Sequence, residues 1–173
     1  LLLTAAAAAA SLIAAAPALA RPMTATDLVM MQRMGAPSIS PDGKTAIFTI
    51  STTDLKANRR KQVLHRLDLT RDGAKPVPVA GIGEGHSAVF GGDGAIWYLA
   101  PVKGQDQLFR LPLGGRAVQV STIAGDIAGF KLSADGSRLV LFADRDLKCT
   151  DFACADVKAE SRGGSARAHD QLF

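Results

Sequence analysis

Few residues of this chain have types and spacing that could support catalysis. Acyl transfer by serine uses the pattern Gly-x-Ser-x-Gly at a turn between a strand and a helix, where the hydroxyl is exposed beside backbone N–H donors. The nearest match is Gly163–Arg167, which has Arg167 where the second glycine must stand and follows no strand pattern. We interpret this segment as a flexible linker and predict no catalytic residue in the chain.

The three histidines have no recognisable catalytic context. His65 lies within a strand pattern, His86 in a glycine-rich turn, and His169 at the start of a strand pattern. A general base needs a nucleophile and an orienting acid within reach, and no spacing in the sequence predicts such a group. Structural or surface roles are therefore predicted for all three.

The two cysteines leave three alternatives open. Four residues separate Cys149 from Cys154 and no second Cys/His pair lies nearby, which disfavours a metal site; His169 would be its only downstream candidate ligand. A local disulfide is favoured, and two free thiols are the remaining alternative. We also predict no cofactor, since Gly81–Gly85 lacks the helix and the Lys-Ser/Thr pair of a phosphate-binding loop.

The first twenty residues have the composition of an export signal. Leu1–Ala20 is uncharged and rich in alanine and leucine, and Ala18-Leu19-Ala20 before Arg21 has the small-x-small cleavage pattern. A membrane anchor is the alternative, because about twenty apolar residues can span a bilayer. We predict cleavage between Ala20 and Arg21 and a secreted or periplasmic protein, whose membrane contact is only through this signal. Such a compartment permits disulfides.

The charge pattern argues against a nucleic-acid partner. The net charge is +4, and Arg59–Lys61 forms the only basic cluster, with no aromatic residues interleaved. Binding of nucleic acid calls for a basic stripe or stacking aromatics. A solvated loop between strands is the predicted structure for this cluster.

One turn signature recurs three times along the chain. Asp-Gly pairs at Asp42, Asp93 and Asp135 each precede an apolar run, and they are separated by 51 and 42 residues. Asp-Gly between apolar runs predicts a hairpin with a type I′ turn, because glycine adopts a positive φ at no steric cost. The spacing is close to the period of a four-stranded propeller blade. The predicted fold is therefore all-β, a partial β-propeller of about three four-stranded blades.

The chain divides into three predicted parts: a signal peptide at 1–20, a short helix and lead-in at 21–37, and blades at 38–173 with a Cys-containing insertion at 144–168. Thr24 or Thr26 can cap the helix, and Gly35 and Pro37 are expected to end it. Its methionine-rich apolar face is expected to pack on the edge of the first blade, with an adaptable binding surface as the alternative. Strands are predicted at 46–51, 62–69, 75–80, 87–90, 96–99, 107–111, 117–121, 127–132, 138–143 and from 169 onward.

We expect the chain to be the N-terminal part of a longer protein. A repeat unit cannot bury its apolar face without neighbours, and three blades are too few to close a ring. The sequence opens at Leu1 with no initiating methionine and closes at Phe173 within an apolar stretch.

Several stretches resemble secreted serine peptidases of the prolyl oligopeptidase family, in its acylaminoacyl and dipeptidyl peptidase branches. They are 27–34, the Ser-Pro-Asp-Gly turn at 38–44, the loop and strand at 54–69, and 169–173. The resemblance implies that the propeller gates peptide access to a C-terminal α/β-hydrolase domain with a Ser-Asp-His triad. That domain lies outside this chain, so the chain alone is expected to be inactive. Its implied partners are the missing hydrolase domain and, through the full-length enzyme, a peptide substrate. Because TolB-like propellers share the turn, a non-catalytic periplasmic propeller that binds proteins is the alternative.

Overall fold

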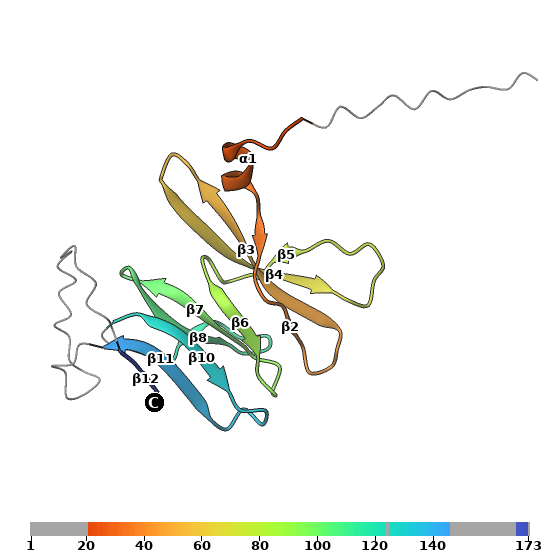
Figure 1. Cartoon of the computed structure of the whole chain (residues 1–173). Coiled ribbons are helices and arrows are strands. Elements are labelled where there is room, and N and C mark those ends of the chain that lie inside the picture. Colours follow the sequence, from red (N-terminus) through yellow and green to blue (C-terminus); the bar gives the residue numbers. More distant parts are fainter. Residues whose placement is uncertain (1–20, 124, 146–168, 173) are drawn as a thin grey trace, which may run out of the picture.

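The computed structural model describes residues 21–123, 125–145 and 169–172. The predicted signal peptide, the linker at 163–167 and both Cys149 and Cys154 lie outside the described residues. The described chain forms three antiparallel sheets, each built from consecutive strands (Figure 1). This is the arrangement of successive propeller blades, and the predicted partial propeller is confirmed.

The first sheet has four strand positions filled by five strands. Two short strands, β1 and β2, both pair with one edge of β3, while β4 pairs along its whole other edge. Pro37, between the two short strands, has no N–H to donate to the sheet. The strands of this sheet are β1 (Arg33–Met34), β2 (Ser38–Ile39), β3 (Thr45–Asp54), β4 (Arg59–Asp68) and β5 (Val77–Pro78).

The second sheet contains four strands and the described part of the third contains three. The strand predicted from His169 onward is present as β12, which pairs with β11. The outermost strands of the first two sheets, β5 and β9, are only two residues long, and Pro78 lies on such an edge, where a missing N–H is tolerated. The strands are β6 (His86–Phe90), β7 (Ile96–Val102), β8 (Gln105–Leu111), β9 (Val118–Gln119), β10 (Ile127–Leu132), β11 (Leu139–Arg145) and β12 (His169–Leu172).

The hydrophobic core lies between neighbouring sheets. Side chains alternate along β7, so that Tyr98 and Ala100 pack toward the first sheet while Trp97 and Leu99 pack toward the third. Both faces of the second sheet are therefore covered. This explains why β7 is apolar at successive positions rather than at every second one.

The three Asp-Gly corners occupy equivalent positions, since they join β2 to β3, β6 to β7 and β10 to β11. The predicted type I′ geometry is wrong, because that turn needs positive φ at both central residues and here only the glycine has it. Each glycine N–H instead closes a β-turn to the carbonyl three residues earlier, at 2.8 to 3.0 Å. In the first turn Pro41 favours the observed geometry, because its ring holds φ near −65° at the first central position, where a type I′ turn would need a positive φ. The left-handed glycines are Gly43 (φ 70°), Gly94 (φ 76°) and Gly136 (φ 69°).

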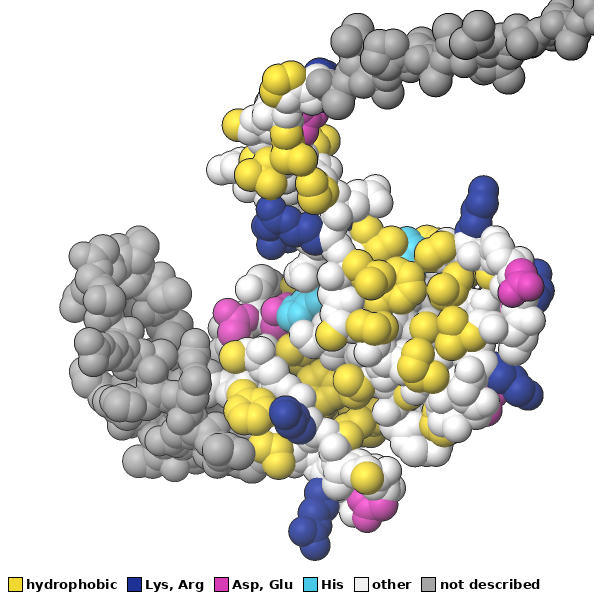
Figure 2. All heavy atoms as spheres, turned by 45° about the vertical axis from the view of Figure 1, so that its right-hand side comes forward, with side chains coloured by type: hydrophobic (Ala, Val, Ile, Leu, Met, Phe, Trp, Pro, Cys, Tyr) yellow, Lys and Arg dark blue, Asp and Glu magenta, His cyan; other side chains and the backbone are white. Residues whose placement is uncertain are grey.

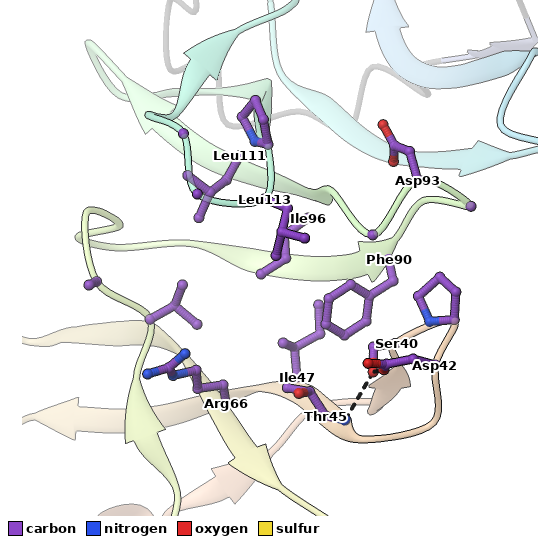
Figure 3. Close-up of a pocket in the computed structure, with 18 residues that line it drawn as sticks. Ser40, Asp42, Thr45, Ile47, Arg66, Phe90, Asp93, Ile96, Leu111 and Leu113 are labelled. Atoms are coloured by element: carbon purple, nitrogen blue, oxygen red, sulfur yellow. Dashed lines mark hydrogen bonds between the residues drawn. The ribbon is translucent and has the colours of Figure 1, made fainter.

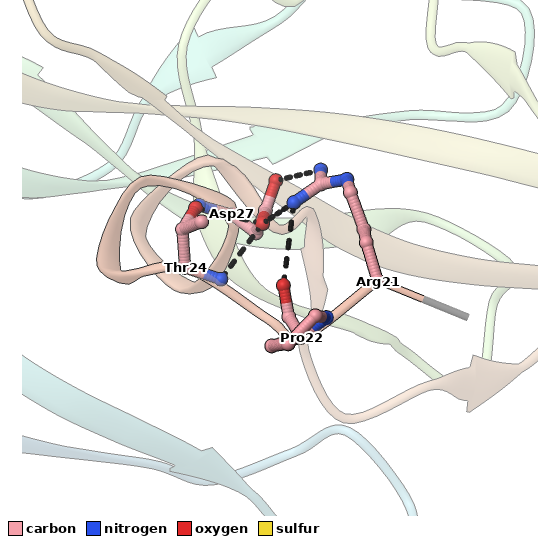
Figure 4. A network of polar contacts seen from close by, with 4 residues as sticks. All are labelled: Arg21, Pro22, Thr24 and Asp27. Carbon is pink, nitrogen blue, oxygen red and sulfur yellow. Dashed lines mark hydrogen bonds and ion pairs between the residues drawn. The ribbon is translucent and has the colours of Figure 1, made fainter. Parts of the chain in front are cut away.

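The predicted N-terminal helix is present as α1 (Ala25–Met30), with Thr24 as its cap. The Thr24 hydroxyl accepts from Asp27 N (3.1 Å), and the Asp27 carboxylate accepts from Thr24 N (2.9 Å), which together form a capping box. Arg21 donates to both Asp27 oxygens, at 2.6 and 2.7 Å (Figure 4). The helix ends earlier than Gly35 and Pro37, the predicted stops, because the chain leaves the helix to pair with β3 as β1.

The apolar face of α1 is not packed on the first blade, contrary to the prediction. The helix has no buried residue, and Figure 2 shows its hydrophobic side chains gathered at the surface. A helix of two turns offers little area for packing, and the β1 strand that follows it is also exposed. The exposed apolar side chains of this segment are Met23, Leu28, Val29, Met30, Met31 and Met34.

Candidate functional site

A cavity lies between the first and second sheets, at the end where the Asp-Gly turns lie. Its volume is about 610 Å³, within the range of about 300 to 1,000 Å³ typical of ligand pockets. β3 contributes Ile47, which is fully buried, and β6 and β7 contribute Phe90 and Ile96 (Figure 3). These side chains meet there because both sheets turn an apolar face to the gap.

Charged groups stand at the rim of this inter-blade pocket. Asp42 and Asp93 come from the turns, and Arg66 comes from β4 directly opposite Ile47. Asp93 already pairs with Arg110, whose guanidinium lies 5.7 Å from the ring centre of Trp97. Figure 3 shows Arg66 to the left of Ile47 and Asp42 to its right, with Phe90 above Ile47. The pocket therefore combines apolar side chains with charges of opposite sign on either side of Ile47.

Hydrogen bonds hold the pKa of each turn carboxyl below its ordinary value. For Asp42 the main cause is the Ser40 hydroxyl, and for Asp93 it is the backbone N–H of Ala95, followed by Arg110. For Asp135 the hydroxyls of Ser133 and Ser137 and the Ser137 N–H lower the pKa to about 2. All three carboxylates therefore stay charged in mildly acidic solution.

Acid is expected to weaken the Asp135 turn in a defined pH range. Because the folded-state pKa of Asp135 is depressed to about 2 from 3.8, its stabilising contribution is complete above pH 4 and is lost as the pH falls toward 2. The Asp135→Asn variant should lose this part of the acid dependence. An NMR titration of the Asp135 carboxyl carbon checks the claim, and a midpoint near 4 would contradict it.

His65 has a structural environment, as predicted. Its Nδ1 lies 3.1 Å from the Val63 carbonyl oxygen, and its ring stacks on Phe48 with centres 6.4 Å apart. Neither contact places a nucleophile beside the ring. His169 begins β12, where it pairs with Arg145 in the β11 ladder.

His86 lies in a chain of hydrogen bonds that the sequence did not predict. Its Nε2 is 2.8 Å from Asp106 Oδ2, and its Nδ1 is 3.0 Å from Ser87 Oγ. A carboxylate only accepts, so Nε2 carries the proton, and in the neutral ring Nδ1 accepts from the serine hydroxyl. Asp106 is twenty residues away in the sequence, and only the β7–β8 hairpin brings it to β6.

Ser87, His86 and Asp106 are the residue types of a serine-hydrolase triad, but we interpret their contact as structural. Acyl transfer also needs N–H donors aimed at the substrate oxygen, and the neighbouring Gly85 N–H is used in a bond to Gln62 O (3.0 Å). Asp106 N in turn donates to Asp126 Oδ1 (2.7 Å), just before β10. The chain of bonds therefore joins the second sheet to the start of the third.

Gly81–Gly85 connects the first sheet to the second. Glu84 within it forms a surface ion pair with Arg59 at 3.0 Å. The loop predicted for the basic cluster is wrong, because Arg59–Lys61 forms the exposed start of β4. Within the described residues no group of three His, Cys, Asp or Glu side chains could hold a metal ion. No helix in this part of the chain has the length and apolarity to cross a membrane.

No protein-family model matches this chain. Dipeptidyl-peptidase 5 of Porphyromonas endodontalis is 35% identical over 124 residues, which cover 70% of this chain and 18% of the relative.

Solved structures of peptidases share the fold. The acylaminoacyl peptidase of Pyrococcus horikoshii matches with a TM-score of 0.56 and 15% identity, over 72% of this chain and 19% of that protein. The β-propeller domain of the Trilobed protease from Pyrococcus furiosus matches with a TM-score of 0.50 and 11% identity, over 66% of this chain and 34% of the domain. The chain thus spans about a fifth of the length of the first two proteins. The sequence likeness and the stacked sheets with cores between them identify this chain as a peptidase propeller region.

Proposed function

We propose that this chain is the N-terminal propeller region of an exported serine peptidase of the prolyl oligopeptidase type. In the whole protein the propeller would gate peptide access to a C-terminal α/β-hydrolase domain, which would cleave peptides through a serine nucleophile. The observation that carries the proposal is the 35% identity to dipeptidyl-peptidase 5 over most of this chain. Export is proposed from the apolar Leu1–Ala20 segment and its small-x-small pattern.

The role proposed for this segment is to select substrates by size, and not to catalyse their hydrolysis. Its blades are held by apolar cores between the sheets, so they form a rigid wall that can exclude large substrates. The nucleophile, the base and the oxyanion donors would come from the hydrolase domain. The peptides that the whole enzyme would take are those small enough to pass the propeller.

The coding sequence beyond Phe173 tests the proposed function directly. We expect a further roughly 400 to 500 residues that contain Gly-x-Ser-x-Gly, followed by Asp and then His. An open reading frame that stops after a few more blades would overturn the proposal and support a TolB-like binding propeller instead.

A serine-directed fluorophosphonate probe tests whether this chain lacks a reactive serine, as the proposed gating role requires. The purified chain should remain unlabelled, while an active serine hydrolase in the same tube is labelled. Ser87 is the residue to watch, because its hydroxyl lies 3.0 Å from His86 Nδ1. Labelling that disappears in the Ser87→Ala variant would show that this chain carries a reactive serine of its own.

A further inference from the structure

The two ends of the inter-blade pocket differ in charge, and both charges are available. The Asp42 carboxylate uses Oδ1 to accept from the Ser40 hydroxyl (2.6 Å) and from Lys44 N (3.1 Å), and within the described residues no hydrogen bond reaches its Oδ2. Arg66 is exposed and forms no ion pair with any described residue. The pocket therefore offers one unpaired cation and one carboxylate oxygen with free acceptor capacity.

The floor between these charges is apolar and already formed. Phe90, Ile96 and Leu111 are partly buried, pack against the core between the first two sheets and also line the pocket. An aliphatic side chain placed on this floor would leave water for a preformed hydrophobic surface, which favours binding. A ligand that suits the whole pocket must thus be apolar in the middle and carry opposite charges at its two ends.

We propose that the inter-blade pocket binds short peptides with free termini and an aliphatic side chain. The ammonium group would lie at Asp42 and the carboxylate at Arg66, whose planar guanidinium can donate two parallel hydrogen bonds to a carboxylate. The pocket would hold a substrate fragment or product on the propeller.

The spacing of the two charges sets the length of the ligand. Arg66 pairs with Ile47 across the β3–β4 ladder, and Asp42 precedes Ile47 by five residues. At about 3.3 Å per residue, Asp42 and Ile47 are at most about 16 Å apart along the chain, and the β-turn that Gly43 N closes to Ser40 O shortens this distance. An extended tripeptide, about 10 Å between its terminal charges, is shorter than this limit and is the probe that we choose.

Ligand-observed saturation-transfer NMR with Gly-Leu-Gly and the full chain tests the proposal. The leucine methyl groups should receive saturation, because they would lie against Phe90 and Ile96, which line the pocket and are only partly buried. N-acetyl-Gly-Leu-Gly and Gly-Leu-Gly-amide each lack one charge, and each should bind about fivefold more weakly, the effect of losing one partly exposed ion pair. Absence of transfer to the methyl groups, or equal binding of all three peptides, would overturn the proposal.

Two variants show whether the charges act where we place them. Arg66→Gln should bind the free acid and the amide equally well, and Asp42→Asn should bind the free amine and the acetylated peptide equally well. Asparagine can still accept the turn hydrogen bonds, so the Asp42 turn is kept. A variant that weakens all three peptides by the same factor would contradict the proposed orientation.

Matched controls separate these effects from changes in folding. Arg60→Gln removes a cation from β4 six residues before Arg66, and Asp135→Asn changes the equivalent turn of the third sheet; neither residue lines the pocket. Both controls should keep the wild-type preference for free termini. Binding is measured on this chain alone, so the pocket proposal can fail while the downstream sequence still supports the proposed function, and the reverse also holds.

Discussion

Replacing Leu64 with alanine is expected to lower the free energy of unfolding by about 2 to 5 kcal/mol, the range for a buried leucine that leaves a cavity. Leu64 lies on β4 with 1% of its surface exposed, in the core that joins the first sheet to Tyr98 of the second. Urea unfolding followed by circular dichroism measures the loss. Because the cavity opens between two sheets, hydrogen exchange in β7 should accelerate together with that in β4.

Leu55→Ala is the matched control for this prediction. Leu55 is in the loop between β3 and β4 and is 55% exposed, so its truncation should change stability by no more than about 0.5 kcal/mol. If Leu64→Ala accelerates exchange in the first sheet and leaves β7 unchanged, the sheets do not share a core, and the propeller interpretation of their packing is wrong.

Gly91→Ser is expected to destabilise the protein by about 1 to 3 kcal/mol, the usual cost of overpacking a well-packed site. Ser40 and Ser133 occupy the equivalent position in the other two turns, and each hydroxyl there accepts a backbone N–H at 2.9 Å. A comparison of the three turns alone would therefore favour serine at position 91. In the second turn, however, a Cβ at Gly91 would lie 2.8 Å from Asp93 Oδ1 and 3.0 Å from Trp97 Nε1.

The cause of this expected loss is crowding by the Asp93 and Trp97 side chains, not the backbone conformation. Trp97 packs toward the third sheet and Asp93 pairs with Arg110, so neither group can move away without losing a contact. Gly83→Ser is the control, since a Cβ at Gly83 meets nothing within 4 Å and its φ is not positive. Thermal unfolding of both variants decides the matter: a Gly91→Ser protein at least as stable as wild type would show that the turn can relax.

The strand pattern could be predicted from the sequence because its signals are local. An Asp-Gly pair between apolar runs specifies a chain reversal wherever it occurs, and its recurrence near Asp42, Asp93 and Asp135 indicated repeated hairpins. The Thr24 cap of α1 was also readable, since the cap and the first turn of a helix are only three residues apart. The turn type was not, because Pro41 and the Asp hydrogen bonds favour a different geometry for the same residues.

The pocket and the His86 chain could not be predicted, because their members are distant in the sequence. Arg66 reaches Ile47 only through the β3–β4 register, and Asp106 reaches His86 only through the β7–β8 hairpin. The exposure of the α1 apolar face was missed for a related reason. Periodicity identifies an apolar face, but whether a neighbour covers it depends on where the chain places the helix.

The sequence by itself determined the all-β class, the repeat and the position of each hairpin, because turn chemistry and apolar runs act over a few residues. Only the tertiary structure decided which faces of the sheets meet, that the core lies between blades, and that Asp42 and Arg66 line one cavity. Those features depend on contacts between residues far apart in the chain. A residue type or a spacing alone does not encode them.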